Sequence, residues 1–513
     1  MRYYEAALSA VEALQDIAPQ ELAALYVDAG FGHRRNLDVG LARDRFEKAA
    51  TCYRRLGDAV GLAKVLIFLI RLDHMDGSMF SGTLSSYVTE LETVFTALSD
   101  ADLNLRGHVL ALLAQAYRFA KQPSRAVALA TDGLAIGRQT ADDRVCAQAA
   151  NSLGLAFLSD LRVNPAIESW QASFRAARIT GDPTLQMLAL TNLPLALNLQ
   201  GALEEGEARA LEGIESANMI QYWNEHSKAI SHLASIAAAK GQFGRATQYA
   251  QDTMAMVARC HYPWSGFRAL STLAYVSAAR GRWDEANQAL LITPGKVFAA
   301  PSPFLRVYTR IFRQLLLGYR KTMLTDYVAL LHDDLMEVAT YDTYSLAPLC
   351  AMIELSALVM MPDWAERPAR MLAEAMDRGV VFSSGWCFLI PRVLGVAAMM
   401  QEDWEQAKVH FQHAIAVATD ANAGPELART YLDYAQLLYD DPPSRDDDEG
   451  TSVHDLLAKA RWLFYECHMM PYARHTSVYL EAWFPHEYPE APGSYTNGGE
   501  PPWPASNGTI APE

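Results

Sequence analysis

The feature that most constrains this chain is a repeat of 40 residues in its central part. A leucine recurs at this interval, and a small residue follows thirteen positions after each leucine. The leucines are Leu113, Leu153, Leu193, Leu233 and Leu273, and the small residues are Ala126, Ala166, Gly206, Ala246 and Ala286. Five copies in register predict a repeat array, in which each unit packs mainly against its two neighbours.

Each repeat is expected to contain two antiparallel helices, here called helix A and helix B. The leucine falls on helix A and the small residue on helix B, and three of the turns between them open with Gly201, Gly241 and Gly281. The leucine fills the space between the helices, and the small residue lets the second helix approach closely. A sixth copy returns at Leu394 and Ala407. We therefore predict an all-α solenoid of about ten antiparallel helix pairs.

The regularity of the pattern divides the chain into four parts. Irregular helical repeats are expected in 1–100, the regular 40-residue repeats in 101–292 and looser helical repeats in 293–484. In 485–513, proline, glycine, serine and asparagine replace most aliphatic residues. Such a segment cannot bury enough apolar surface to offset the entropy lost on ordering, so we predict a disordered tail.

Glycine, proline and aspartate mark the expected ends of the early helices. Pro19 suits the first turn of a helix, which Gly30 and Gly32 are expected to close. Asp38 is placed to start the next helix and Gly57 to end it. Strand-forming patterns are almost absent, which supports an all-α chain.

Composition and charge narrow the classes of partner. The chain has 513 residues, of which 51% are hydrophobic and 20% charged, and its net charge is −16. This negative field repels phosphate backbones, so we expect no direct binding of nucleic acid. The six cysteines are scattered with no CxxC pair, no secretory signal opens the sequence, and no apolar run is long enough to span a bilayer. We expect a cytoplasmic protein that does not bind membranes.

The paired-helix pattern, with a Gly-x-aromatic turn into helix B, resembles tetratricopeptide repeats. Its unit is longer than the usual ~34 residues of that class. It is similar to the repeats in regulatory arms of MalT-like and LuxR-type transcription regulators and of ATPase-linked adenylate cyclases. The opening YYEAALSAVEAL (Tyr3–Leu14) resembles the start of such an arm, and GPELARTYLDYAQLL (Gly424–Leu438) resembles its penultimate helix pair.

The resemblance implies a sensor or scaffold in bacterial signal transduction or transcriptional regulation. The phosphate-binding loop, the cyclase domain and the C-terminal helix-turn-helix of those regulators have no counterpart in this sequence. Our leading hypothesis is a non-catalytic scaffold whose concave face binds a peptide, a protein partner or a small inducer. The alternative is a detached regulatory arm whose ATPase or cyclase domains lie on an upstream segment.

No pattern of catalytic residues stands out. His410 and His413 lie three apart on a predicted helix, but zinc needs three or four convergent ligands. No GxSxG elbow, cysteine-protease signature or cofactor motif occurs. A helical enzyme such as a prenyltransferase would need paired acidic motifs on facing helices, whereas the acidic run 440–449 lies in a proline-rich segment. We expect neither an enzyme nor a bound metal or cofactor.

Polar residues beside the repeat leucines are the candidate binding residues. They occupy the two positions before each leucine and a position one turn earlier, and we call them the polar column: Asn151, Ser152, Asn192, Lys228, His232 and Arg268. The tetratricopeptide resemblance implies that they line the concave face and that Asn192, Lys228 and His232 stand where some of these domains hold a peptide carboxylate. Amide and ammonium donors suit a carboxylate. The competing interpretation is a polar face covered by water.

Overall fold

The structure, a computed structural model, describes residues 17–36, 38–76, 87–258, 262–292, 302–320, 325–340, 342–440 and 452–485, together with residues 5, 6, 8 and 10. In this part of the chain there are twenty-three α-helices, one short 3-10 helix and one isolated β-bridge, between Phe382 and Leu389. No helix described here combines the length and apolarity needed to cross a bilayer. The predicted all-α fold is confirmed.

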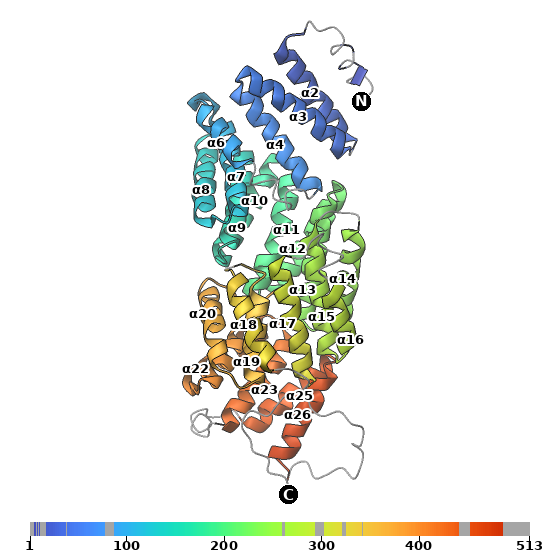
Figure 1. Ribbon diagram of the computed structural model, residues 1–513, viewed down its shortest axis with the longest axis vertical. Helices are drawn as coiled ribbons and strands as arrows, with labels where there is room; N and C mark the ends of the chain where they lie inside the picture. The colour runs from blue at the N-terminus through green and yellow to red at the C-terminus, as the bar shows by residue number, and fades with distance from the viewer. Residues whose placement is uncertain are drawn as a thin grey trace.

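The helices progress along the long axis of the molecule from the N-terminal end to the C-terminal end, with α13–α16 and α17–α20 at similar heights (Figure 1). Their bounds are α2 (Pro19–Arg35), α3 (Val39–Leu56), α4 (Ala59–Asp76), α6 (Val88–Ala97), η2 (Asp100–Asp102), α7 (Leu103–Phe119), α8 (Pro123–Gln139), α9 (Asp143–Leu158), α10 (Val163–Thr180), α11 (Pro183–Gln200), α12 (Leu203–Met219), α13 (Trp223–Ala239), α14 (Phe243–Val257), α15 (Pro263–Ala279), α16 (Trp283–Ile292), α17 (Pro303–Tyr319), α18 (Thr325–Val338), α19 (Leu346–Leu358), α20 (Asp363–Asp377), α21 (Ile390–Met400), α22 (Trp404–Asp420), α23 (Gly424–Asp440), α25 (Val453–Glu466) and α26 (Met470–Trp483).

Several helix ends lie where local sequence signals place them. Asp38 caps α3 by accepting a hydrogen bond from the backbone N–H of Leu41 (3.1 Å), and Gly57 ends α3 in the left-handed conformation. Gly181 ends α10 in the same conformation, and Asp182 then caps α11. Glycine meets the positive φ without strain, and an aspartate accepts from backbone N–H groups that the helix leaves free.

The prediction that Gly30 and Gly32 end the second helix is wrong. Helix α2 runs through both glycines to its end at Arg35. A Cβ at position 30 would lie 2.7 Å from the ring of Phe46, so Gly30 is needed for the close packing of α2 against α3. A glycine that serves helix packing and a glycine that ends a helix look alike in sequence.

The five regular repeats form the helix pairs α7/α8, α9/α10, α11/α12, α13/α14 and α15/α16, in which the odd-numbered helix is helix A. Four of the repeat leucines are buried, Leu273 is partly buried, and the four alanines thirteen positions later are buried. Neighbouring A helices also pack on one another, from α7 to α15 and again from α17 to α23. The predicted antiparallel pairing within each repeat is confirmed.

The stack of repeats winds into a superhelix, so that late helices meet early ones. At three turn glycines with positive φ, an added Cβ would lie close to a residue roughly 180–190 positions later in the chain: 3.2 Å from Val381 at Gly201, 3.1 Å from Pro425 at Gly241 and 2.6 Å from Pro471 at Gly281. Each of these glycines therefore serves both its own turn and the contact between successive superhelical turns. Neither the period nor the composition of the sequence predicts which residues meet in this way.

The connection between α20 and α21, here called the interior loop (residues 378–389), enters the superhelix. The backbone N–H of Val381 donates to the carbonyl of Leu199 (2.7 Å). The hydroxyl of Thr272 donates to the carbonyl of Gly385 (3.2 Å). The loop is thus hydrogen-bonded to A helices that precede it by more than a hundred residues.

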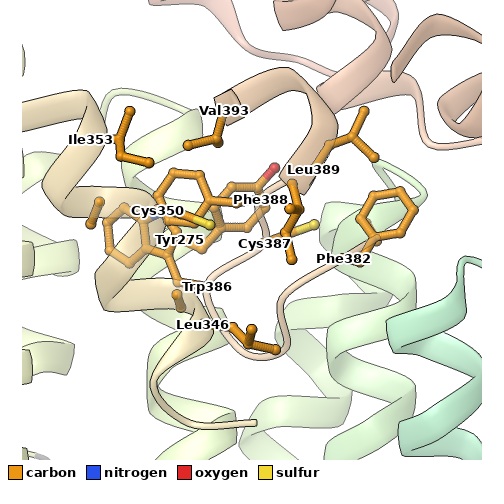
Figure 2. Packing of buried hydrophobic residues seen from close by; sticks show 14 of the residues in the cluster. Tyr275, Leu346, Cys350, Ile353, Phe382, Trp386, Cys387, Phe388, Leu389 and Val393 are labelled. Atoms are coloured by element: carbon orange, nitrogen blue, oxygen red, sulfur yellow. The ribbon is translucent and has the colours of Figure 1, made fainter. Parts of the chain in front are cut away.

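The side chains of the interior loop form the centre of the largest hydrophobic cluster. Trp386, Cys387 and Phe388 are buried among residues of α15, α19 and α21, including Tyr275 and Cys350 (Figure 2). The aromatic rings fill the space that the curved stack of A helices would otherwise leave open. The interior of this solenoid is therefore partly filled by its own chain.

Three sequence predictions fall mainly outside the described residues. The opening segment Tyr3–Leu14 is described at four positions, the acidic run 440–449 at Asp440, and the predicted disordered tail 485–513 at Pro485.

Replacing Gly395 by alanine should lower the free energy of unfolding by about 1–3 kcal/mol, because overpacking a tight contact is destabilising. The added Cβ would lie 2.6 Å from the ring of Phe411. Gly244→Ala is the matched control, since nothing lies within 4 Å of a Cβ at that position in α14. The control should be neutral or up to about 1 kcal/mol more stable, because alanine favours the helix. Urea unfolding followed by circular dichroism measures both, and equal midpoints would contradict the packing role of Gly395.

Candidate functional site

The polar column lies on consecutive A helices, as the repeat requires. Asn151 and Ser152 lie on α9, Asn192 on α11, Lys228 and His232 on α13, and Arg268 on α15. Five of the six residues are buried, and the side chain of Lys228 is 11% exposed. Water therefore does not cover this face, which packs inside the superhelix.

Side-chain hydrogen bonds join the polar column from one repeat to the next. The Asn192 amide nitrogen Nδ2 donates to Oδ1 of Asn151 (3.0 Å), and Nζ of Lys228 donates to Oδ1 of Asn192 (2.8 Å). Farther along, Nη1 of Arg268 donates to Oγ of Ser231 (2.9 Å). The partners are 36 to 41 residues apart, so each bond spans one repeat. The structure thus brings Asn151, Asn192 and Lys228 into direct contact.

Ser152 and His232 occupy other parts of the same surface. Oγ of Ser152 accepts a hydrogen bond from Nε2 of Gln115 (2.8 Å). His232 is fully buried, and its Nδ1 has no hydrogen-bond partner among the described residues. Burial, together with the positive charges of Arg268 and Lys228, holds the pKa of His232 well below its usual value. His232 is therefore a neutral imidazole.

Three cations share this interior surface with one carboxylate. We call Arg118, Lys228 and Arg268 the basic cluster. Glu225 forms an ion pair with Lys228 and accepts a hydrogen bond from Thr191. Within the described part of the chain, neither arginine of the cluster forms an ion pair with a carboxylate. The interior is thus locally positive in a chain whose net charge is −16.

The pKa values of Arg118 and Lys228 show the cost of this arrangement. Burial lowers the pKa of Arg118 to about 10. Burial also lowers the pKa of Lys228; Glu225 opposes this change, and the charges of Arg268 and Arg118 add to it. An additional negative charge at this place would offset that cost for both cations.

Aromatic residues border the basic cluster. The rings of Trp264 and Tyr344 lie 4.2 Å apart between centroids. Burial raises the pKa of Tyr262 and of Tyr344, so both phenols are neutral and do not compensate the arginine charges. A bound anion would therefore meet cations, neutral hydroxyl groups and aromatic faces.

A second site, which the sequence analysis did not identify, lies nearer the C-terminus. A cavity of about 390 Å³ lies between α19, α21, α23 and α26, and we call it the C-terminal cavity. Charged, sulfur-containing and aromatic side chains line it, among them Glu354, Arg392, Arg429, Asp433, Met399, Met400, Trp404, Tyr472 and Tyr479.

Five charged residues beside this cavity form the ionic cluster: Glu354, Arg392, Glu426, Arg429 and Asp433. Arg392 donates to Oε2 of Glu426 (3.0 Å) and to Oδ2 of Asp433 (2.7 Å), and Arg429 donates to Oε1 of Glu426 (3.0 Å). Both arginines also donate to Oε1 of Glu354. Every cation here has carboxylate partners, in contrast to the basic cluster.

Burial affects two carboxylates of the ionic cluster differently: it raises the pKa of Asp433 despite the nearby Arg392, whereas the pKa of Glu354 is lowered. Burial alone would raise the pKa of Glu354, but Arg429 and Arg392 outweigh it and hold the pKa below its usual value. The hydroxyl of Tyr319 donates to the other oxygen of Glu354 (2.8 Å). The members of the cluster lie on A helices at intervals of 34 to 41 residues, which is the signal that could have revealed them in the sequence.

The described residues include no group of three or more histidine, cysteine, aspartate or glutamate side chains placed to hold a metal ion. His410 accepts or donates one hydrogen bond, with Gln406 (3.1 Å).

Comparison with known proteins adds information on the fold alone. No protein-family model and no curated protein matches the sequence. Among solved structures, a Rap protein complexed with competence and sporulation factor is similar over 70% of this chain and 99% of its own, with a TM-score of 0.53 and 13% identity. A second solved structure is that of a signal-transduction ATPase with numerous domains and a tetratricopeptide-repeat sensor, from Pyrococcus horikoshii. The similar region covers 76% of this chain and 55% of the ATPase, with a TM-score of 0.47 and 12% identity. The predicted tetratricopeptide-like α-solenoid is confirmed.

Replacing Glu354 by glutamine should lower the free energy of unfolding at neutral pH by about 3–5 kcal/mol, because it removes a compensating charge from two buried arginines. The pKa of Glu354 in the folded state lies below the ordinary value of 4.5. Its stabilising effect is therefore complete above pH 4.5 and is lost as the pH falls below that value. The difference between wild type and Glu354→Gln should shrink over the same range.

Urea unfolding at a series of pH values measures this difference. Glu466→Gln, at an exposed position in α25, is the control and should leave the midpoint unchanged at every pH. A Glu354→Gln effect that is independent of pH would show that Glu354 does not act through its charge.

Proposed function

We propose that this chain is a non-catalytic helical-repeat protein that binds a protein or peptide partner, and that it holds an anionic group of the partner at the basic cluster. The observation that carries the proposal is the charge imbalance on the inner face. Three cations share one carboxylate there, whereas both arginines of the ionic cluster are paired with several carboxylates. Among the described residues, the arginines of the basic cluster thus lack the carboxylate partners that the arginines of the ionic cluster have.

Electrostatics favours an anion at the basic cluster. Removing a cation from water is costly unless an opposite charge compensates it. A carboxylate near Arg118, Lys228 and Arg268 would supply that charge and form charge-assisted hydrogen bonds, which arginine can make in pairs. The hydrogen bonds from Lys228 to Asn192 and from Arg268 to Ser231 already orient two of the cations, so little further ordering is required on binding.

The anion that fits best is a single carboxylate, at the end of a peptide or on an acidic side chain. The net charge of −16 disfavours polyanions such as nucleic acid, which would meet repulsion along most of their length. Arg118 is half-buried and gives the cluster its contact with solvent. The solved Rap complex supports the proposal in one respect, because a protein of similar fold there accommodates a bound factor.

Sequence resemblance supports a more specific biological role. The likeness of Tyr3–Leu14 and Gly424–Leu438 to MalT-like and LuxR-type arms favours a role in bacterial signal transduction or transcriptional regulation. By the same likeness, a detached regulatory arm of an ATPase-linked adenylate cyclase or LuxR-type regulator is the second candidate, and a small carboxylate inducer is the second candidate ligand. The coding sequence upstream of Met1 distinguishes the two functions: a stop codon with no adjacent ATPase frame contradicts the detached arm.

Replacing Lys228 by alanine or Arg268 by glutamine should reduce recovery of the partner from an extract of the source cell at least about tenfold, because each change removes a desolvated charge contact. Bound peptides would be identified by mass spectrometry. Amidation of their carboxyl groups should weaken their binding to the protein. Arg175→Gln, at an exposed position of α10, is the matched control and should not change recovery.

The same variants test the charge argument without a ligand. Glutamine at 268 removes a cation that has no carboxylate partner among the described residues and can still donate to Ser231. The thermal midpoint of the ligand-free Arg268→Gln variant should therefore be unchanged or raised. Unchanged partner recovery in both variants would remove the proposed site, and a large loss of stability would contradict the charge imbalance.

A further inference from the structure

We propose that the C-terminal cavity is a second binding site, for an organic cation: a primary amine or a guanidinium joined to an apolar or aromatic body. The inference is independent of the proposed function, because the cavity shares no residue with the basic cluster and takes a group of opposite charge.

The charges around the cavity favour a cation over an anion. The ionic cluster contains two arginines and three carboxylates, so it carries one excess negative charge. Nε, Nη1 and Nη2 of Arg392 each donate to a different carboxylate, and Nη1 and Nη2 of Arg429 donate to two of them. These N–H groups of the two arginines already donate to carboxylates of the ionic cluster. Glu402 and Asp440, at exposed positions on the rim, add to the negative potential.

Asp433 is the member of the ionic cluster that a ligand can reach. It is 26% exposed, whereas the other four members are at most 5% exposed. Its Oδ2 accepts from Nη1 of Arg392, and its Oδ1 accepts no hydrogen bond from a described residue. An ammonium or guanidinium in the cavity would find this oxygen as a charged acceptor in a partly desolvated position, where such a bond is strong.

The walls of the cavity suit an apolar or aromatic body. Met399 and Met400 at the end of α21 are flexible and polarisable, and Trp404 lies beside them at the start of α22. Tyr472 and Tyr479 of α26 complete the lining, and burial raises the pKa of each to about 12, so both rings are neutral. Neutral aromatic faces attract cations, and methionine and aromatic side chains pack against apolar groups.

The size and opening of the cavity limit the ligand further. Its volume of about 390 Å³ lies near the lower end of ordinary ligand pockets, about 300–1,000 Å³. Met360, Glu402 and Asp440 on its rim are exposed, so the cavity is open to solvent. The occupant is therefore either a free small amine or a lysine or arginine side chain of a partner, with one apolar neighbour.

Isothermal titration calorimetry of the full chain tests the inference with three probes. Tryptamine represents a free aromatic amine, indole-3-propionate is the matched anion, and acetyl-Phe-Lys-amide represents a basic side chain of a partner. We expect saturable one-to-one binding of at least one cation and none of the anion. Binding of tryptamine assigns the site to free amines, and binding of the peptide alone assigns it to a basic side chain of a partner.

Variants establish the place of binding. Asp433→Asn should weaken binding of the cation at least about tenfold, because the contact with a charged acceptor is lost. Val396→Trp, which fills the cavity from α21, should abolish binding of the cation. If Asp433→Asn does not fold, Val396→Trp alone tests whether the cation binds in the cavity. Asp420→Asn, at an exposed position of α22, is the matched control. Lys228→Ala should bind the cation as tightly as wild type does. Loss of cation binding at the cavity and loss of partner binding at the basic cluster can therefore be told apart.

Absence of binding by both cations, binding of indole-3-propionate as tight as that of tryptamine, or normal binding by Val396→Trp would each overturn the inference.

Discussion

The structure depends on side-chain contacts that join helix A of one repeat to helix A of the next. In the regular part these are hydrogen bonds between polar residues, such as those of Asn192 with Asn151 and of Lys228 with Asn192. Toward the C-terminus the same spacing recurs with charged partners, as between Arg392 and Glu354, which lie 38 residues apart. Because buried polar groups are costly without partners, each repeat must stay in register with its neighbours.

The second constraint is the return of the chain on itself. The interior loop passes between superhelical turns and donates and accepts backbone hydrogen bonds with residues of α11 and α15. Trp386 and Phe388 then bury the surface that an open solenoid would leave to solvent (Figure 2). An inner face that would be a groove in an extended array thus becomes an interior, and the residues that remain reachable are those at its edges, such as Arg118 and Asp433.

Two clusters of opposite character result from this closure. The basic cluster has three cations and one carboxylate, while the ionic cluster has two cations and three carboxylates. Partial burial strengthens the electrostatic selectivity of both, because charges interact more strongly where water is excluded. A protein with both sites could contact two groups of one partner or two different ligands, and the separate variants at Lys228 and Asp433 distinguish these cases.

The helix pairs and the polar column could be predicted from the sequence, because both depend on neighbours in the same or the next repeat. Leu153 and Ala166 are buried on the two helices of one pair, and Asn192 bonds to Asn151 across one interval. The sequence did not reveal that α2 continues through Gly30, since the reason is the ring of Phe46 on another helix. It also did not reveal the C-terminal cavity or the imbalance at the basic cluster. Both features depend on the tertiary structure, because superhelical closure brings together residues such as Gly241 and Pro425, whose separation in the chain follows no repeat period.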